Sequence, residues 1–312
     1  MSSRANIDIH LKNMIGGREV PVRGQWGFCP GAIAIKSIGE IGLGLYINRG
    51  TKESCDFRGT NGQSPIIDGG AEQLLYELDT TQNYDVGARE ALPDGTEFRY
   101  CKSTGATTLK PNVGCCHSDT GFLAYTAFGV SAVIGDKEIT IPAATHAAVA
   151  KDALRGGYVV VFDGSSGDDV TYEIAGNDAS LADVAFKVTL TSKIGVTITA
   201  ATDACEVYSN PWGAIVYGSA VLPFAGVPAK TVTATASYFW CQTKGPKFVS
   251  SQSGVGADNG GLVAYWRHDG SLQQGETALG ATVPALDTNQ IAGSIIAGSQ
   301  AGNGPLVFLK GV

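Results

Sequence analysis

Charged side chains are scarce in this chain of 312 residues. There are 22 Lys and Arg residues and 29 Asp and Glu residues, so 16% of the chain is charged and the net charge is −7. Soluble chains usually carry about 25% charged residues. Two explanations fit: much of the surface faces other subunits, whose interface cores are poor in charge, or the surface is neutral and rich in Gly, Ser and Thr. The acidic balance argues against nonspecific binding to nucleic acid, which needs a basic face.

The sequence also lacks the motifs of common active sites. The phosphate-binding patterns G-x-x-x-x-G-K-[ST] and G-x-G-x-x-G do not occur, nor does the G-x-S-x-G of serine hydrolases. None of the four histidines stands in a recognisable acid–base pattern: His10, His117, His146 and His268. We therefore expect no enzymatic activity and no bound cofactor.

Neither a disulfide framework nor a membrane span is indicated. The cysteines are odd in number and irregularly spaced: Cys29, Cys55, Cys101, Cys115, Cys116, Cys205 and Cys241. The first residues have no apolar stretch of the kind that signal peptides carry, which favours free thiols in a reducing compartment. The most apolar window, residues 122–134, is shorter than the roughly 20 residues that cross a bilayer.

The sequence contains no residue spacing that is typical of a metal site. Cys115-Cys116-His117 comes nearest to a zinc pattern, but adjacent cysteines point in different directions, so we interpret it as a loop with free thiols. Asp163, Asp168 and Asp169 cluster in one turn. A solvated turn is the favoured interpretation, and calcium binding there stays open. We expect no metal site.

Short apolar runs alternate with glycine-rich turns through most of the chain. This pattern predicts a mainly β protein, an antiparallel sandwich or barrel with long loops. The clearest hairpin has strands at residues 157–162 and 170–174, joined by a Gly/Ser/Asp turn.

A second hairpin is predicted around Pro93-Asp94-Gly95, with strands at residues 89–92 and 96–101. One helix is expected, at residues 143–154, because this segment is rich in Ala and is followed by two glycines.

The composition changes near residue 85. We expect an N-terminal arm and Gly-rich loop region at residues 1–85 and a β-rich body at residues 86–312, in which residues 123–210 form an inserted β-subdomain. Residues 1–25 contain too few large apolar groups to fold alone. We expect this arm to pack on another subunit as an added strand, with these interface residues: Ile7, Ile9 and Leu11 as apolar contacts, and Arg4, Lys12, Arg18 and Arg23 near acidic surface.

The aromatic residues allow two interpretations. Tyr158, Tyr238 and Trp240 are predicted to be core residues of the β body. Alternatively, the rings of residues 238–240 and 265–266 would form a platform on which a sugar stacks. Alternation along a strand would place only half of these rings on one face, so we favour the core.

Two segments are similar to virion proteins of tailed bacteriophages, in particular β-rich capsid cement or decoration proteins. They are residues 92–100 and the series formed by residues 156–160, 210–211, 226–228 and 238–246. The similarity covers residues 86–250 and rests on turns and aromatic strand ends, without catalytic residues.

This resemblance implies a virion structural protein on the capsid surface, synthesised in the host cytoplasm, that stabilises major-capsid subunits. Its partners would be the major capsid protein and copies of itself, in a homo-oligomer such as a trimer, with no nucleic acid and no membrane. The alternative is a tail, tail-tube or adhesin-type β protein with carbohydrate-binding capacity.

Overall fold

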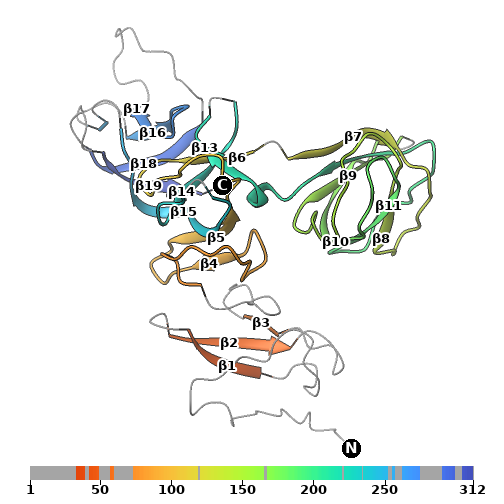
Figure 1. Cartoon of the computed structure of the whole chain (residues 1–312), viewed down its shortest axis with the longest axis horizontal. Coiled ribbons are helices and arrows are strands. Elements are labelled where there is room, and N and C mark those ends of the chain that lie inside the picture. The colour runs from red at the N-terminus through yellow and green to blue at the C-terminus, as the bar shows by residue number, and fades with distance from the viewer. Residues whose placement is uncertain are drawn as a thin grey trace, which may run out of the picture. The chain divides into compact units, whose positions relative to one another are not determined.

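The chain is mainly β, as the sequence predicts (Figure 1). The computed structural model describes three strands before residue 60, as backbone only, and residues 73–311 with gaps at 119, 165–166, 220, 234, 252–254, 257–261, 275–289 and 299–303. Among these residues every regular element is a strand, apart from a 3-10 turn at Pro211–Gly213.

The first three strands form a small antiparallel sheet of their own. Its order is β1 (Ile33–Ile38), β2 (Gly42–Asn48) and β3 (Phe57–Gly59), with Ile35 opposite Leu45. The region expected at residues 1–85 to consist of an arm and Gly-rich loops thus contains three strands. Glycine is frequent here and lies within the strands themselves, at Gly42 and Gly44 of β2 and Gly59 of β3.

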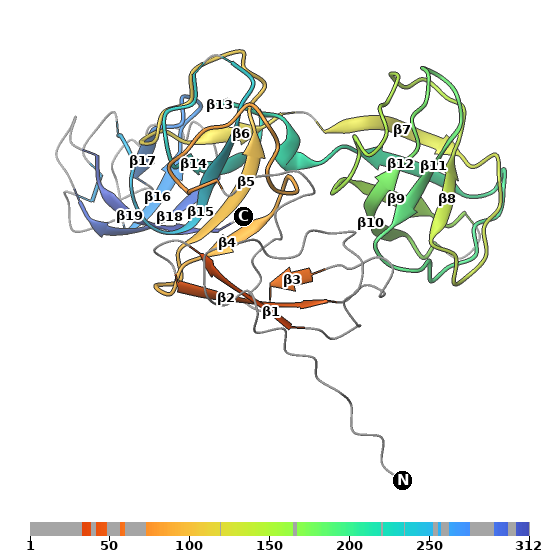
Figure 2. The same ribbon diagram turned by 60° about the horizontal axis from the view of Figure 1, so that its bottom comes forward.

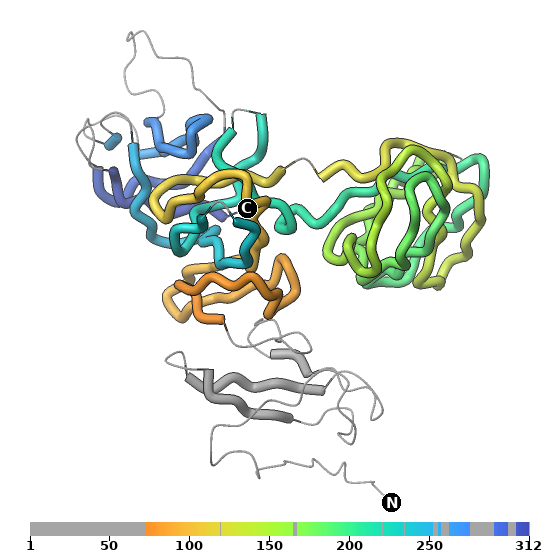
Figure 3. The backbone as a smooth tube through the Cα atoms, viewed as in Figure 1, coloured from red at the N-terminus to blue at the C-terminus, as the bar shows by residue number. Residues whose placement is uncertain are grey.

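The chain divides into two compact units. Unit 2 is residues 117–214, and unit 1 consists of the chain on either side of it. Figure 3 follows the chain into unit 2 after β6 (Cys115–His117) and out of it before β13 (Ile215–Tyr217). The two ends of unit 2 adjoin, because Ser118 N donates to Ala214 O at 2.9 Å. The inserted subdomain expected at residues 123–210 falls within this unit.

Unit 2 is a curled six-stranded antiparallel sheet (Figure 2). Its strands, in spatial order, are β7 (Gly121–Ala127), β12 (Ala204–Tyr208), β9 (Tyr158–Phe162), β10 (Val170–Asn177), β11 (Phe186–Leu190) and β8 (Glu138–Ile141). Apolar and polar residues alternate, so one face lines a core that includes Val159, Ile174 and Val188. The predicted hairpin of β9 and β10 is confirmed, with Val161 opposite Val170.

The helix predicted at residues 143–154 does not form. Its apolar residues lack a helical period, and the buried amide of Asn177 organises the segment instead. Asn177 Oδ1 accepts from Leu154 N at 2.8 Å, and its Nδ2 donates to Ala150 O at 2.9 Å. Val149 also pairs with Ser180 in an isolated bridge. The segment is thereby held against the sheet as turns.

Unit 1 is a larger antiparallel sheet that curls around a second core. Its main path runs β13, β6, β14, β15, β19, β18, β16, β17, and β4 pairs with β5, which pairs with β15. The bounds not yet given are β4 (Arg89–Ala91), β5 (Glu97–Lys102), β14 (Phe224–Pro228), β15 (Tyr238–Phe248), β16 (Val263–Trp266), β17 (Leu272–Gln274), β18 (Ile291–Ala297) and β19 (Leu306–Lys310). The predicted hairpin around residues 93–95 is confirmed as β4 and β5.

Residues before the expected boundary at residue 85 also bond to the strands of unit 1. Gln73 already belongs to unit 1, because its side chain donates to Tyr238 O at 3.0 Å and accepts from Tyr100 Oη at 2.7 Å. Asn83 N donates to the same Tyr100 oxygen at 3.1 Å. These bonds join polar residues far apart in the sequence, which composition does not reveal.

We predict that Asn177→Ala destabilises unit 2 by about 2–3 kcal/mol, because it leaves a buried backbone donor and acceptor without partners. Urea unfolding of the full chain, followed through Trp212 fluorescence in unit 2, would measure the change. Asp178→Ala, at the exposed neighbour, serves as the control and should change the unfolding free energy by less than about 0.5 kcal/mol. Equal effects of the two substitutions would contradict the proposed role of the buried amide.

Candidate functional site

One face of the large sheet in unit 1 is apolar and open to solvent. Along β19 exposed and buried residues alternate, so Leu306 and Phe308 point outward while Val307 and Leu309 enter the core. Phe248 of β15 stands opposite Leu306. Phe248 is 50% exposed and Phe308 39% exposed, although such large side chains usually lie inside.

The same face continues onto the neighbouring strands. Opposite residues of an antiparallel pair share a face. Ser294 of β18 lies opposite Phe308, and Val263 of β16 lies opposite Ser294. Ile291 of β18 lies opposite Tyr265 of β16, which is on the same face as Val263. All of these residues are at least partly exposed. Pro246 of β15 lies opposite Phe308 and is exposed as well. We call the apolar residues of this set the outer apolar face: Pro246, Phe248, Val263, Ile291, Leu306 and Phe308.

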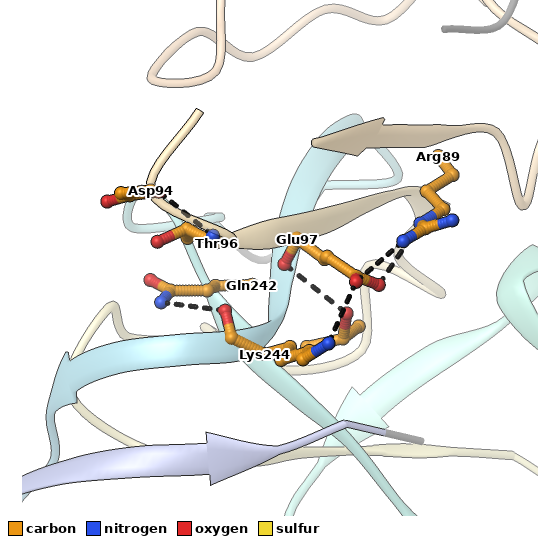
Figure 4. Close-up of polar contacts among 7 residues, drawn as sticks. Arg89, Asp94, Thr96, Glu97, Gln242 and Lys244 are labelled. Atoms are coloured by element: carbon orange, nitrogen blue, oxygen red, sulfur yellow. Dashed lines mark hydrogen bonds and ion pairs between the residues drawn. The ribbon is translucent and has the colours of Figure 1, made fainter. Parts of the chain in front are cut away.

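An ion-pair cluster borders this face where β4 and β5 meet β15 (Figure 4). Arg89 Nη2 lies 2.6 Å from Glu97 Oε1, and Lys244 Nζ lies 3.2 Å from the same oxygen. The Arg89 hydrogen bond, helped by Lys244, holds the pKa of Glu97 below its usual value against the opposing effect of burial. Asp94 shapes the preceding turn by accepting from Thr96 N at 2.9 Å.

The aromatic residues predicted for the core divide between core and surface. Trp240 is 2% exposed and packs edge-on against Tyr100, with ring centroids 5.1 Å apart. Tyr238 is half-buried and stacks on Tyr100. Tyr158 is 40% exposed, so its assignment to the core is wrong: it alternates with the buried Val159 along β9 and points outward.

Of the residues considered for a sugar platform, 238–240 and 265–266, only Tyr238 and Tyr265 are partly exposed. Phe239, Trp240 and Trp266 are all buried, and Trp266 stacks on Phe224 inside unit 1. No ligand reaches these rings without opening the core.

The five cysteines in the described residues are free and buried. Cys115 of β6 and Cys241 of β15 meet with their sulfur atoms 3.6 Å apart. Burial raises the pKa of both thiols and of Cys101, and raises the pKa of Cys116 and Cys205 to about 12. These sulfurs stay protonated near neutral pH, which makes them poor nucleophiles.

The metal interpretations gain no support from the described residues. Within them no group of three His, Cys, Asp or Glu side chains is arranged to hold a metal ion. Cys115 faces Cys241, whereas Cys116 enters the core beside Phe224. His117 Nδ1 bonds to Pro211 O at 2.8 Å instead. Burial lowers the pKa of His117, which opposes its protonation.

Two further expectations concern the chain ends and the membrane. Ile7, Ile9, Leu11, Arg4, Lys12, Arg18 and Arg23, the predicted interface residues, lie outside the described residues. In the part of the chain that the structure covers, no helix is long and apolar enough to cross a membrane.

The outer apolar face was not identified from the sequence, although one signal was present. Residues 306–309 are apolar at every position. A strand with one face in solvent would instead alternate apolar and polar residues. Continuous apolar runs are typical of strands that are covered on both faces. In β19 one of these faces is exposed in the single chain.

The described residues form a mainly β protein of two compact units, and unit 1 carries an exposed apolar face. No family model, curated protein or solved structure matches the chain. Its function is therefore argued from the surfaces themselves.

We predict that Glu97→Gln lowers the stability of unit 1 at pH 7 by about 0.5–1 kcal/mol, since partly exposed ion pairs contribute modestly. The pKa of Glu97 is depressed in the folded state, so its contribution is complete above the unfolded pKa and is lost as the pH falls through the folded pKa. The stability difference between wild type and variant should therefore shrink below about pH 4.5, the unperturbed value. Urea unfolding at pH 7, 5 and 3 measures it.

Glu138→Gln provides a matched control. Its partner Lys187 is 59% exposed, so this substitution should have a smaller effect at every pH. A pH-independent loss in Glu97→Gln would contradict the ionic origin of the effect.

Proposed function

We propose that this chain is a virion structural protein of a tailed bacteriophage, of the cement or decoration kind. It would bind the outside of the head and hold neighbouring major-capsid subunits together. The observation that carries the proposal is the outer apolar face of unit 1, whose six apolar residues span four strands and adjoin Lys244 and Lys310 at one end. The class of particle is inferred from the turn and aromatic patterns of residues 86–250 alone.

The energetics favour burial of this face against a partner. Covering a Phe or Leu side chain contributes about 1.5–3 kcal/mol, from which the entropy of association must be subtracted. The six residues of the outer apolar face carry no charge, and the Arg89–Glu97–Lys244 cluster lies beside them. An apolar centre with a polar rim is the usual anatomy of a protein interface. The partner surface on the capsid would be apolar as well.

The buried thiols and the buried His146 are used to hold the fold, which is compatible with a binding role. The thiols are buried and protonated. Both ring nitrogens of the buried His146 contact backbone carbonyl oxygens, of Ala147 at 2.8 Å and of Val184 at 3.1 Å. These groups are engaged in holding the fold.

The location is tested by immunogold electron microscopy of purified particles with an antibody against this chain. Gold on the heads is the expected result. Gold confined to the tails would replace the proposal by the tail alternative, and particles without gold would overturn both.

We predict that the double variant Phe248→Ser, Phe308→Ser loses most of its attachment to heads while remaining folded. Both side chains are exposed, so the core of unit 1 is not opened. The loss of two large contacts should weaken binding by at least about a hundredfold. Co-sedimentation with heads that lack the chain measures attachment, and circular dichroism verifies folding.

The matched control is Leu181→Ser, Val184→Ser, which removes two exposed apolar side chains from unit 2. Attachment should persist in this control. If both double variants attach as the wild type does, the outer apolar face is not the docking surface.

A further inference from the structure

The net charge of the chain is concentrated in unit 2. Residues 117–214 contain 12 of the 29 acidic residues and 5 of the 22 basic ones, a balance of −7. The rest of the chain therefore holds 17 of each and is neutral. Within that rest, residues 1–25 have the opposite sign, with four basic residues against Asp8 and Glu19.

Unit 2 also presents aromatic rings on the outer side of its sheet. Tyr158 of β9 lies opposite Tyr208 of β12, and both point away from the core. Phe162, four residues after Tyr158 and on the same face of β9, contacts the ring of Tyr125 from β7, with centroids 5.1 Å apart. Tyr125 is 62% exposed and Tyr158 40% exposed. We call these four residues the ring face.

Two carboxylates flank the ring face. Glu173 of β10 lies opposite Tyr158, and Glu206 of β12 accepts a short hydrogen bond from Tyr208. That bond is the main reason why the pKa of Tyr208 is raised. Neither glutamate has an ion-pair partner among the described residues. The four strands β7, β12, β9 and β10 contain no Lys or Arg at all.

Exposed rings beside unneutralised carboxylates match the chemistry of a basic polypeptide. An Arg or Lys side chain gains from the negative face of a Tyr ring when it lies within about 6 Å of the centroid. The neighbouring carboxylates then pair with the same cation. A neutral sugar would also stack on the rings, but it would gain nothing from the charge of the unit.

We propose that the ring face of unit 2 binds residues 1–25 of a second copy of this chain. Arg4, Lys12, Arg18 and Arg23 supply cations that suit the tyrosines and glutamates, and the opposite signs of the two segments draw them together. The site is then completed between copies, so that each chain gives its arm and receives another. This inference does not depend on the proposed attachment to a head, since it concerns a different unit and is measured in solution.

The test uses the full chain with Arg4, Lys12, Arg18 and Arg23 all replaced by Gln, which leaves its ring face free. The probe is a fluorescent synthetic peptide of residues 1–25, and its anisotropy is followed during titration. A second peptide carries the same four Gln substitutions. We expect the first peptide to bind, more weakly as salt is raised, and the second to bind at least about tenfold more weakly.

Two variants of the receptor locate the site. Glu173→Gln with Glu206→Gln should weaken binding about fivefold, and so should Tyr125→Ser with Tyr158→Ser. The matched controls are Glu138→Gln, outside the ring face, and Tyr217→Ser, an exposed tyrosine of unit 1. These two should bind as the parent does.

Three results would overturn the proposal. The peptide does not bind, or it binds equally to the ring-face variants and the controls, or the ring face binds neutral glycans on an array while ignoring the peptide. The last result would assign the rings to carbohydrate instead.

Discussion

Strand β15 is the element on which unit 1 depends. It pairs with β5, β14 and β19, and residues 239–243 are buried one after another. A strand buried in this way must have side chains packed against both of its faces and hydrogen-bonded strands close to both of its edges. Glycine makes this approach possible: Gly226 has φ +141°, and a Cβ there would lie 2.4 Å from Gln242 O. Gly245 has φ +99°, and a Cβ there would lie 2.7 Å from Thr96 Oγ1. Part of the high glycine content is thus a packing requirement.

The packing of β15 also determines what the surface offers. Because the strand bridges the β4–β5 hairpin and the β19–β18 pair, it places the Arg89–Glu97–Lys244 cluster beside the outer apolar face. Unit 1 is therefore suited to contacts that exclude water. Unit 2 folds around a separate core and has the acidic, aromatic exterior that suits a charged partner. The two units thus expose surfaces of different chemistry.

The sequence predicts the parts of the fold that local chemistry determines. The turns at residues 93–95 and 163–169 have enough Gly, Pro and Asp to predict both hairpins. The helix at residues 143–154 is wrong because a single distant amide, that of Asn177, outweighs a weak Ala propensity.

The ring face could not be predicted, because its residues come together through strand order. β12 lies between β7 and β9, so Tyr208 meets Tyr158 from 50 positions away. No spacing in the sequence indicates this. The outer apolar face did leave a trace, the unbroken apolar run of β19, but its exposure depends on what the rest of the chain leaves uncovered.

The central claim is that the chain works by burying the outer apolar face of unit 1 against another protein. Hydroxyl-radical footprinting of purified particles and of the isolated chain, read by mass spectrometry, tests it most directly. We expect Phe248 and Phe308 to be strongly protected in the particle, while the exposed Leu181 of unit 2 changes little. Equal labelling of Phe248 and Phe308 in both states would contradict the claim.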